Sequence, residues 1–260
     1  MLKNVVNIVK IGGNVINDDD QLNSFLFDFA QLKGFKILVH GGGKKATELA
    51  GKLGLEPKLI NGRRITNSEN LEVVTMVYAG LINKNIVAQL QKHKCNAIGL
   101  TGADANTIKA HKRIIKDIDY GFAGDIDHVD HNNIKILLDN NLTPIFCAIT
   151  HDKKGQLLNT NADTIASEVA VALSKAYEVV LTYCFEKNGV LKNMNDENSV
   201  INTINSQDYA SLKKDKIIAD GMLPKLENCF FALQHGVSKI IIGNPTLVAN
   251  KDQPSTTLTL

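Results

Sequence analysis

Short apolar runs alternate with segments that repeat apolar residues at helical spacing along most of the chain. A continuous apolar run is typical of a buried parallel strand, and an i, i+3, i+4 repeat is typical of a helix that packs on one face. The runs lie at 5–11, 35–39, 97–100, 143–149, 177–183 and 238–242, with helical repeats between most of them, and residues 255–260 are predicted to supply a closing strand. This alternation predicts an α/β fold, in which one mostly parallel sheet carries helices on both faces.

The longest helical repeat runs from Thr66 to His93. Thr66 and Glu69 form the capping-box pattern that often opens a helix. The apolar stripe of this helix is broad enough to serve both the protein core and a symmetric partner, with the core as the default interpretation. Residues 107–130 are instead polar and alternating, which predicts a β-hairpin that forms a lid or appendage.

Glycines follow two of the predicted strands. Residues 40–43 read His-Gly-Gly-Gly and open a helical repeat, and residues 10–13 read Lys-Ile-Gly-Gly. Glycine lets the backbone approach a ligand closely, the start of a helix favours an anion, and ligands gather at the carboxyl ends of parallel strands. The pattern favours a carboxylate or phosphate site, although such glycines can also serve only to let a helix pack on a strand. We interpret His40 as structural rather than catalytic.

Composition narrows the class of protein. The 260 residues are 44% hydrophobic and 22% charged, with a net charge of +2, which gives no basic field for nucleic acid. The cysteines have no zinc or disulfide spacing, so we expect buried thiols in a reducing, cytoplasmic compartment. They are Cys95, Cys147, Cys184 and Cys229. No apolar run approaches the roughly 18 residues of a membrane span, so we expect no membrane association.

Two common nucleotide motifs can be weighed directly. The sequence has no G-x-x-x-x-G-K-[ST] motif, which excludes a P-loop nucleotide triphosphatase. Residues 41–46 formally satisfy the dinucleotide pattern G-x-G-x-x-A. They follow the second strand, however, and no acidic residue closes a strand about 20 residues later, as ribose recognition requires. A dinucleotide-dependent oxidoreductase is therefore a distant alternative.

Five segments in order along nearly the whole chain resemble the amino acid kinase family. They are Lys10–Gly13, His40–Gly43, Asn61–Thr66, Asn159–Asp163 and Asp220–Lys225. The Asn-Gly-x-Arg and Asn-x-Asn-Ala-Asp pair is similar to the branch that acts on acylglutamates. The resemblance implies an ATP-dependent kinase that phosphorylates the γ-carboxylate of N-acetyl-L-glutamate, the second step of arginine biosynthesis, with Mg²⁺ carried on the ATP. A carboxylate is already a nucleophile, so no general base is required, and the main demand is for cations and N–H groups that offset repulsion between two anions.

The resemblance also implies a fold and a role for each matching residue. The fold is an αβα sandwich around a mostly parallel eight-stranded sheet, with residues 1–175 binding the acylglutamate and residues 176–260 binding ATP. No residue is expected to be a metal ligand. The implied catalytic residues are Lys10 and Lys225, which touch the transferred phosphoryl group, and Asp163, which holds both lysines. The implied substrate-binding residues are Gly41, Gly42, Arg64 and Asn159, and the nucleotide-binding residues are Gly12, Gly13, Tyr183 and Ile218.

Three departures from the family pattern carry expectations of their own. Residues 183–189 replace a shorter Asp-Val-x-Gly turn on the nucleotide side. Arg63 adds a cation beside Arg64, which keeps N-succinyl-L-glutamate open as the substrate, although neighbouring side chains on an extended segment point to opposite faces and Arg63 can equally face solvent or a partner. The segment before Lys10 is too short for the N-terminal helix with which arginine-inhibited members form hexamers, so we expect a homodimer. A non-catalytic sensor of the same fold is the alternative, but it has no need of both phosphoryl-facing lysines.

Overall fold

The computed structural model describes residues 4–60, 63–193, 195–214, 218, 222–250 and 252–260. Its strands are β1 (Val5–Ile11), β2 (Phe35–His40), β3 (Leu59–Ile60), β4 (Arg63–Arg64), β5 (Ala97–Leu100), β6 (Ile108–Lys112), β7 (Ala123–Val129), β8 (Thr143–Cys147), β9 (Ile149–His151), β10 (Leu157–Thr160), β11 (Glu178–Cys184), β12 (Thr203–Ile204), β13 (Lys239–Gly243) and β14 (Ser255–Leu258). Its α-helices are α1 (Gly13–Asn17), α2 (Asp19–Gln31), α3 (Gly43–Lys52), α4 (Ser68–Thr75), α5 (Asn83–Lys92), α6 (His131–Asp139), α7 (Ala162–Ser174), α8 (Ser206–Lys214) and α9 (Leu223–Gln234). The predicted strand positions coincide, to within a few residues, with β1, β2, β5, β8, β9, β11, β13 and β14.

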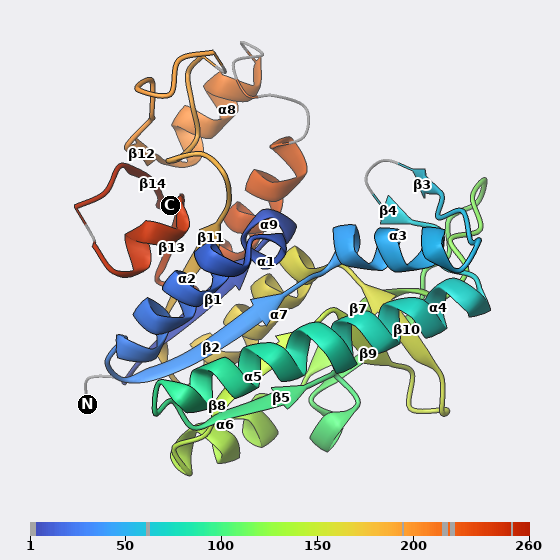
Figure 1. The fold of residues 1–260 in the computed structure, drawn as a ribbon. Helices are drawn as coiled ribbons and strands as arrows, with labels where there is room; N and C mark the ends of the chain where they lie inside the picture. Colours follow the sequence, from blue (N-terminus) through green and yellow to red (C-terminus); the bar gives the residue numbers. More distant parts are fainter. Residues whose placement is uncertain (1–3, 61–62, 194, 215–217, 219–221, 251) are drawn as a thin grey trace.

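The main sheet has eight strands in the order β12-β14-β13-β11-β1-β2-β8-β5. All neighbours are parallel except β13 and β14, which confirms the predicted mostly parallel sheet. Helices cover both faces, with α7 packed against α6 and α9 on one side and α2 against α5 on the other (Figure 1). β1 lies between β2 and β11, so the strands before and after residue 175 form one continuous sheet, and β1 ends where the two halves meet.

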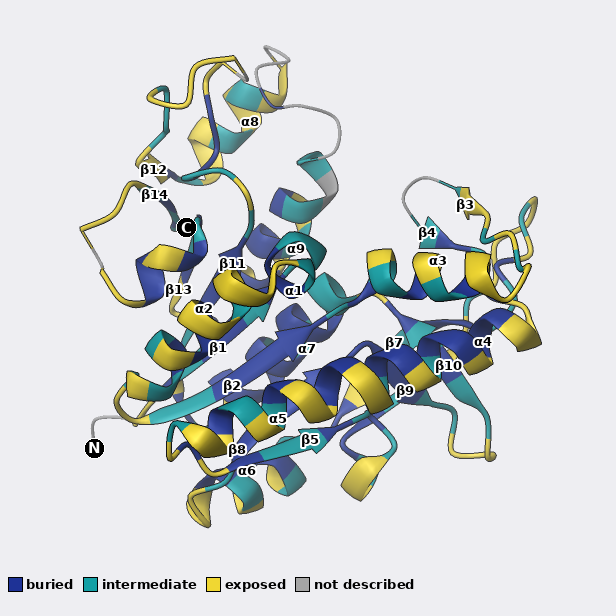
Figure 2. Cartoon of the chain, viewed as in Figure 1, coloured by how far each residue is buried: buried dark blue, intermediate teal, exposed yellow. Residues whose placement is uncertain are grey.

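The longest helix is a continuous run through α4, a π-helical segment (Met76–Ile82) and α5. Its buried stripe faces the core while its outer face is exposed (Figure 2). The predicted capping box is wrong, because Asn67 rather than Thr66 caps the helix by accepting a hydrogen bond from the N–H of Asn70. Thr66 is buried and its hydroxyl donates to the carbonyl of Arg64.

This helix also corrects the expectation that no segment is long enough for a membrane span. By length and composition alone, Ser68–Lys92 meets the requirement for a spanning helix. A core helix of a globular protein meets the same requirement, and here Val74, Ile86 and Leu90 are fully buried in the core. The helix therefore has an apolar face because it covers the sheet.

The predicted hairpin is present but is part of a larger unit. β6 and β7 are antiparallel, and together with β9 and β10 they close a small four-stranded barrel. The predicted strand at 143–149 is divided, because β8 ends at Cys147 in the main sheet and β9 begins at Ile149 in the barrel. Only the pairing partners distinguish the two halves of this apolar run, so the sequence pattern could not separate them.

Candidate active site

Two lysines and one aspartate meet at the carboxyl end of β1. Lys10 is the last residue but one of that strand, Asp163 is in the first turn of α7, and Lys225 is in the first turn of α9. Lys10 Nζ lies 2.7 Å from Oδ1 of Asp163, and Lys225 Nζ lies 3.7 Å from Oδ2 of the same carboxylate. Asn161 caps α7, because its side-chain oxygen accepts hydrogen bonds from the N–H groups of Asp163 and Thr164. The structure thus brings together the three residues expected to be catalytic.

The charge of Asp163 is maintained by the two lysines. Burial by itself raises the pKa of this carboxyl, but the positive charges of Lys10 and Lys225 outweigh burial, and the pKa lies below its ordinary value. One carboxylate therefore fixes two ammonium groups that carry a net positive charge between them. Such a pair is suited to holding an anion that moves between two positions.

Two aromatic residues, Tyr183 and Phe185, pack against the cluster of Lys10, Asp163 and Lys225. Lys225 Nζ lies 5.7 Å from the ring centroid of Tyr183 and 5.4 Å from that of Phe185, within the range of cation–π contacts. The Tyr183 hydroxyl donates to the main-chain carbonyl of Asp163 and lies within hydrogen-bond distance of Ser167 Oγ. Tyr183 was expected at the nucleotide; in the structure only 1% of it is exposed, and its side chain contacts Asp163 and Lys225.

The glycines after β2 are closely packed. A Cβ atom at Gly42 would lie 2.4 Å from Cδ1 of Ile82 and 2.8 Å from Cδ1 of Tyr78, so no side chain fits there. Both contacts come from the π-helical segment, a feature often found at functional sites. Gly42 precedes α3, and no side chain caps that helix. Its first N–H groups are therefore oriented for an anion, as the sequence pattern predicts.

A buried hydrogen-bond chain fixes the orientation of these glycines. His40 is fully buried, with Nδ1 2.8 Å from the carbonyl of Gly41 and Nε2 3.0 Å from Nδ2 of Asn83, which also donates to the carbonyl of Ile145. Burial lowers the pKa of His40 to about 4. A neutral ring that donates from Nδ1 and accepts at Nε2 satisfies both contacts, which supports the structural interpretation of His40.

A pocket of about 180 Å³ opens between these glycines and the barrel. It contains the four residues expected to bind substrate, Gly41, Gly42, Arg64 and Asn159, together with Tyr78, which the sequence analysis did not single out. The signal for Tyr78 was only its place in an apolar stripe, which does not distinguish a pocket wall from core. The pocket also includes Asn161 and Ala162, so it adjoins the turn that bears Asp163.

Arg64 supplies the cation of this pocket. Its side chain is buried, and Nη2 donates to the carbonyl of Gly43 at 3.1 Å and to Oγ1 of Thr47 at 2.7 Å. Nη1 is also buried and has no hydrogen-bond partner among the residues that the structure describes. An unpaired charged donor in a buried position is costly unless a ligand satisfies it, and a carboxylate matches it best. Asn159 is oriented from the opposite side by its donation to Thr66 Oγ1.

Arg63 lines the same pocket, and of the orientations left open by the sequence, this is the one that the structure adopts. Burial lowers the pKa of Arg63, as does the neighbouring positive charge of Arg113, while Asp125 acts in the opposite direction. Arg113 itself is paired with Asp125 at 2.9 Å. A second arginine therefore stands at the pocket wall beside Arg64.

Comparisons with known proteins agree with this geometry. The profile of the amino acid kinase family matches residues 6–244. The chain belongs to this family. A relative from Cytophaga hutchinsonii named acetylglutamate kinase is 56% identical over 236 residues, which are 90% of this chain and 89% of the relative. Another of the same name from Phocaeicola vulgatus is 51% identical over 241 residues, or 93% and 94% of the two chains. Among solved structures, smu.665 from Streptococcus mutans UA159 is 27% identical with a TM-score of 0.77 and 98% coverage of both chains.

The remaining residues of the amino acid kinase pattern lie outside the substrate pocket or outside the part of the chain that the structure describes. Gly12 connects β1 to α1 and Gly13 is the first residue of α1, so both glycines lie at the turn that follows Lys10. Ile218 is buried in the core, so its side chain has little surface to offer a nucleotide. Asn61, Gly62, Asp220 and Gly221, which belong to two of the matching motifs, lie outside the described residues. Within the described part of the chain, no group of three or more His, Cys, Asp or Glu residues could hold a metal ion.

Proposed function

We propose that this protein is an ATP-dependent acetylglutamate kinase, which phosphorylates the γ-carboxylate of N-acetyl-L-glutamate in the second step of arginine biosynthesis. The relatives of that name from Phocaeicola vulgatus and Cytophaga hutchinsonii match 93% and 90% of the chain at 51% and 56% identity. The observation that carries the proposal is the pocket in which Arg64 presents an unpaired guanidinium nitrogen, beside the turn where Asp163 holds Lys10 and Lys225. A carboxylate grip next to two fixed lysines is what transfer between two anions requires.

In this reaction a γ-carboxylate oxygen attacks the terminal phosphorus of ATP. One P–O bond forms to the carboxylate, the P–O bond to the bridging oxygen breaks, and ADP leaves with that electron pair. No proton is transferred in this step, so the site needs no base. In the proposed arrangement Arg64 and Asn159 hold the α-carboxylate, the Gly41 and Gly42 N–H groups face the reacting carboxylate, and Lys10 and Lys225 offset the charge on the transferred oxygens.

The nucleotide is proposed to bind over the half of the sheet formed after residue 175, with Gly12 and Gly13 facing its phosphates, while residues 1–175 bind the acylglutamate. Mg²⁺ is proposed to enter on the β- and γ-phosphates, since this ion usually keeps several waters and is held largely by substrate phosphates. When bound, it would offset phosphate charge. Asp163 is engaged by two lysines, which supports an orienting role for this residue rather than a metal-ligating one.

The acyl group has a second candidate because Arg63 lines the substrate pocket. An acetyl methyl gains nothing from a guanidinium, whereas the terminal carboxylate of an N-succinyl group would need such a cation. N-succinyl-L-glutamate is therefore the alternative substrate. The matched variants are Arg63→Leu and Lys52→Leu, the latter an exposed cation in the last turn of α3. A wild-type preference for the succinyl substrate that only Arg63→Leu abolishes would show that Arg63 recognises the acyl group. A ratio of kcat/KM that Arg63→Leu leaves unchanged would show that it does not, and a wild-type preference for N-acetylglutamate would leave N-acetyl as the substrate.

The deciding experiment is an ADP-release assay with N-acetylglutamate, N-succinylglutamate, glutamate and aspartate, in which hydroxylamine traps the acyl phosphate as a hydroxamate. We expect ADP and hydroxamate in equal amounts with an N-acylglutamate and neither with free glutamate or aspartate. ADP without hydroxamate would indicate simple ATP hydrolysis, and nucleotide binding without ADP release would favour the non-catalytic sensor. Either result would contradict the proposal.

A homodimer in the cytoplasm completes the proposal. Met76 and Leu81 are each 53% exposed on the longest helix, which supports a second copy as the partner of its outer face. All four cysteines are free and buried, which is compatible with a reducing compartment.

A further inference from the structure

The lysine cluster by itself offers little net charge for the proposed substrates. Asp163 cancels one of the two charges of Lys10 and Lys225. Arg64 lines the pocket proposed for the acylglutamate, so its charge is directed to that substrate rather than to the nucleotide phosphates. ATP and an N-acylglutamate both arrive as multiply charged anions, and their mutual repulsion is the main obstacle to the reaction. A further cation near the nucleotide phosphates would reduce that repulsion.

Lys44 has the position that such a cation requires. It is the second residue of α3, immediately after the glycines, and its Nζ donates to the side-chain oxygen of Asn14 in α1. The stem of Lys44 passes over the glycine turn that follows β1, because a Cβ atom at Gly13 would lie 3.8 Å from Cγ of Lys44. On the other side of that turn, a Cβ atom at Gly12 would lie 3.9 Å from Nζ of Lys10. Two lysines thus flank the Gly12–Gly13 turn.

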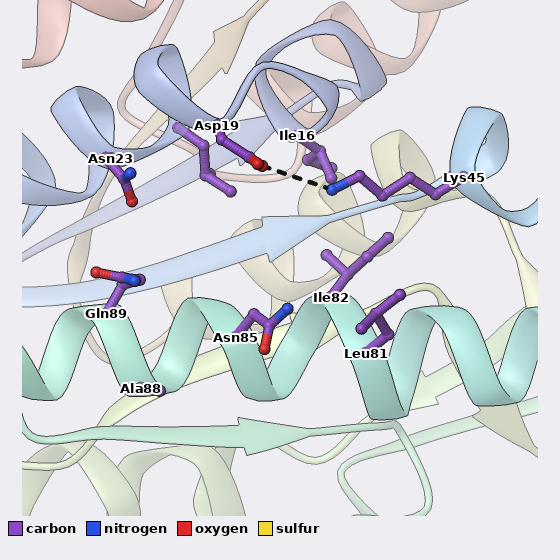
Figure 3. Close-up of a pocket in the computed structure, with 10 residues that line it drawn as sticks. Ile16, Asp19, Asn23, Lys45, Leu81, Ile82, Asn85, Ala88 and Gln89 are labelled. Atoms are coloured by element: carbon purple, nitrogen blue, oxygen red, sulfur yellow. Dashed lines mark ion pairs between the residues drawn. The ribbon is translucent and has the colours of Figure 1, made fainter.

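The charge of Lys44 is not neutralised by the protein. Its hydrogen-bond partner is a neutral amide, and no ion pair within the described part of the chain includes it. The adjacent Lys45, in contrast, has a charged partner and forms an ion pair. Lys45 points into another pocket, between α2 and α5, where its Nζ lies 3.9 Å from Oδ1 of Asp19 (Figure 3). The first turn of α3 therefore carries one paired lysine directed away from the glycine turn and one unpaired lysine directed across it.

We propose that Lys44 is a third phosphate-contacting lysine of the active site, which exchanges the amide oxygen of Asn14 for an oxygen of the terminal phosphates when ATP binds. The exchange replaces a hydrogen bond to a neutral acceptor by a charge-assisted one, which is about twice as strong. The long flexible stem of lysine permits this movement, and its ammonium can follow a point charge without a fixed geometry. Neither the family pattern nor the cluster at Asp163 includes this residue.

The test compares Lys44→Met with Lys45→Met, a matched pair of adjacent residues that lose the same charge. Calorimetric titration with a non-hydrolysable ATP analogue should show affinity lowered by about 10-fold or more in Lys44→Met and by less than about two-fold in Lys45→Met. The dependence of affinity on salt should fall in Lys44→Met alone, and KM for the acylglutamate should stay unchanged. Lys44→Arg should recover most of the lost affinity because it restores the charge.

Asn14→Ala separates this role from a purely structural link between the two glycine turns. Under the proposal, nucleotide affinity in Asn14→Ala stays at or above the wild-type value, since the lysine is released rather than lost. If Asn14→Ala weakens binding as much as Lys44→Met does, the contact is a structural link and the proposal is wrong. Equal losses in Lys44→Met and Lys45→Met, or no loss in either, would also overturn it.

This inference rests on the proposed kinase function, yet the two can fail separately. Binding of the ATP analogue is measured without turnover, so the comparison of Lys44 with Lys45 remains valid in an enzyme with any phosphoryl acceptor. Failure of the wild type to release ADP with an N-acylglutamate would remove the proposed function while leaving the phosphate contact testable. Thermal unfolding of each variant verifies that the native fold is retained.

Discussion

The hydroxyl of Tyr183 donates a hydrogen bond to the main-chain carbonyl of Asp163 across 3.1 Å. The two residues belong to β11 and α7, and register places Tyr183 beside Lys10 of β1. The buried phenol of Tyr183 therefore binds the main chain of Asp163, while Lys10 and Lys225 contact its carboxylate. From this arrangement we expect Tyr183 to be a positioning residue rather than a nucleotide contact.

Tyr183→Phe should test that distinction. The variant keeps the ring beneath Lys225 and removes the hydrogen bond, so we expect the free energy of unfolding to fall by about 1 kcal/mol. We expect kcat to decrease moderately, because Asp163 is less firmly oriented, while KM for ATP stays within about two-fold of wild type. A selective rise in KM for ATP, measured by steady-state ADP release, would instead assign Tyr183 to the nucleotide.

Lys10→Ala and Lys225→Ala should each lower kcat by about 100-fold or more, because each removes a charge that is used mainly in the transition state. KM for either substrate should change much less. Single-turnover formation of the hydroxamate measures the chemical step directly. Lys52→Ala, which removes an exposed lysine from the end of α3, is the control and should retain full activity. A lysine whose loss leaves kcat near wild type does not contact the transferred group.

Arg64→Ala should raise KM for the acylglutamate by about 10-fold or more and leave KM for ATP nearly unchanged. The reason is that the unpaired Nη1 of Arg64 lies in the substrate pocket, and a carboxylate grip is made before and during the reaction. Initial rates across a matrix of both substrates separate the two KM values. Should only KM for ATP rise, the pocket would hold the nucleotide.

His40 should give the stability of the protein a distinct pH dependence. The unfolded ring binds a proton below about pH 6.5, whereas the buried ring does so only at about pH 4. The unfolded state thus binds more protons between these values, so the free energy of unfolding falls as the pH falls through this window, by about 3 kcal/mol in total. Urea unfolding from neutral pH to about pH 4.5 measures this slope. His40→Asn keeps a donor near the Gly41 carbonyl and should show a shallower slope, and an identical slope would mean that His40 titrates normally.

Leu81→Glu should convert a dimer into a monomer, because it places a charge on the exposed face of the longest helix. Ile136→Glu is the control, since Ile136 is similarly exposed, at 58%, but lies on α6. Light scattering gives the mass of each variant. A hexamer in the wild type, or strong inhibition by millimolar arginine, would contradict the expected dimer, as would a wild-type monomer.

The sequence by itself determined the features that depend on residues close to one another along the chain. Continuous apolar runs specified the main strands, and glycines or a lysine at their carboxyl ends marked the edge at which we expect ligands, because parallel strands end on a common side. Asn161 was recognisable as a helix cap since its acceptors and donors lie within three residues. The motifs containing Lys10, Arg64, Asp163 and Lys225 were sufficient to identify the family.

Only the tertiary structure decided which distant side chains meet. The order of the strands places Tyr183 beside Lys10, and its phenol donates a hydrogen bond to the main-chain carbonyl of Asp163. Thr66 fails as a cap because the barrel strands bury it against Asn159. The side-chain direction of Arg63 depends on the barrel strands beside it, and that of Lys44 depends on Asn14 in α1. The spacing of apolar residues predicts which face of a segment is buried, but it does not predict which other segments pack against that face. The site forms only because the fold brings the separate motifs together.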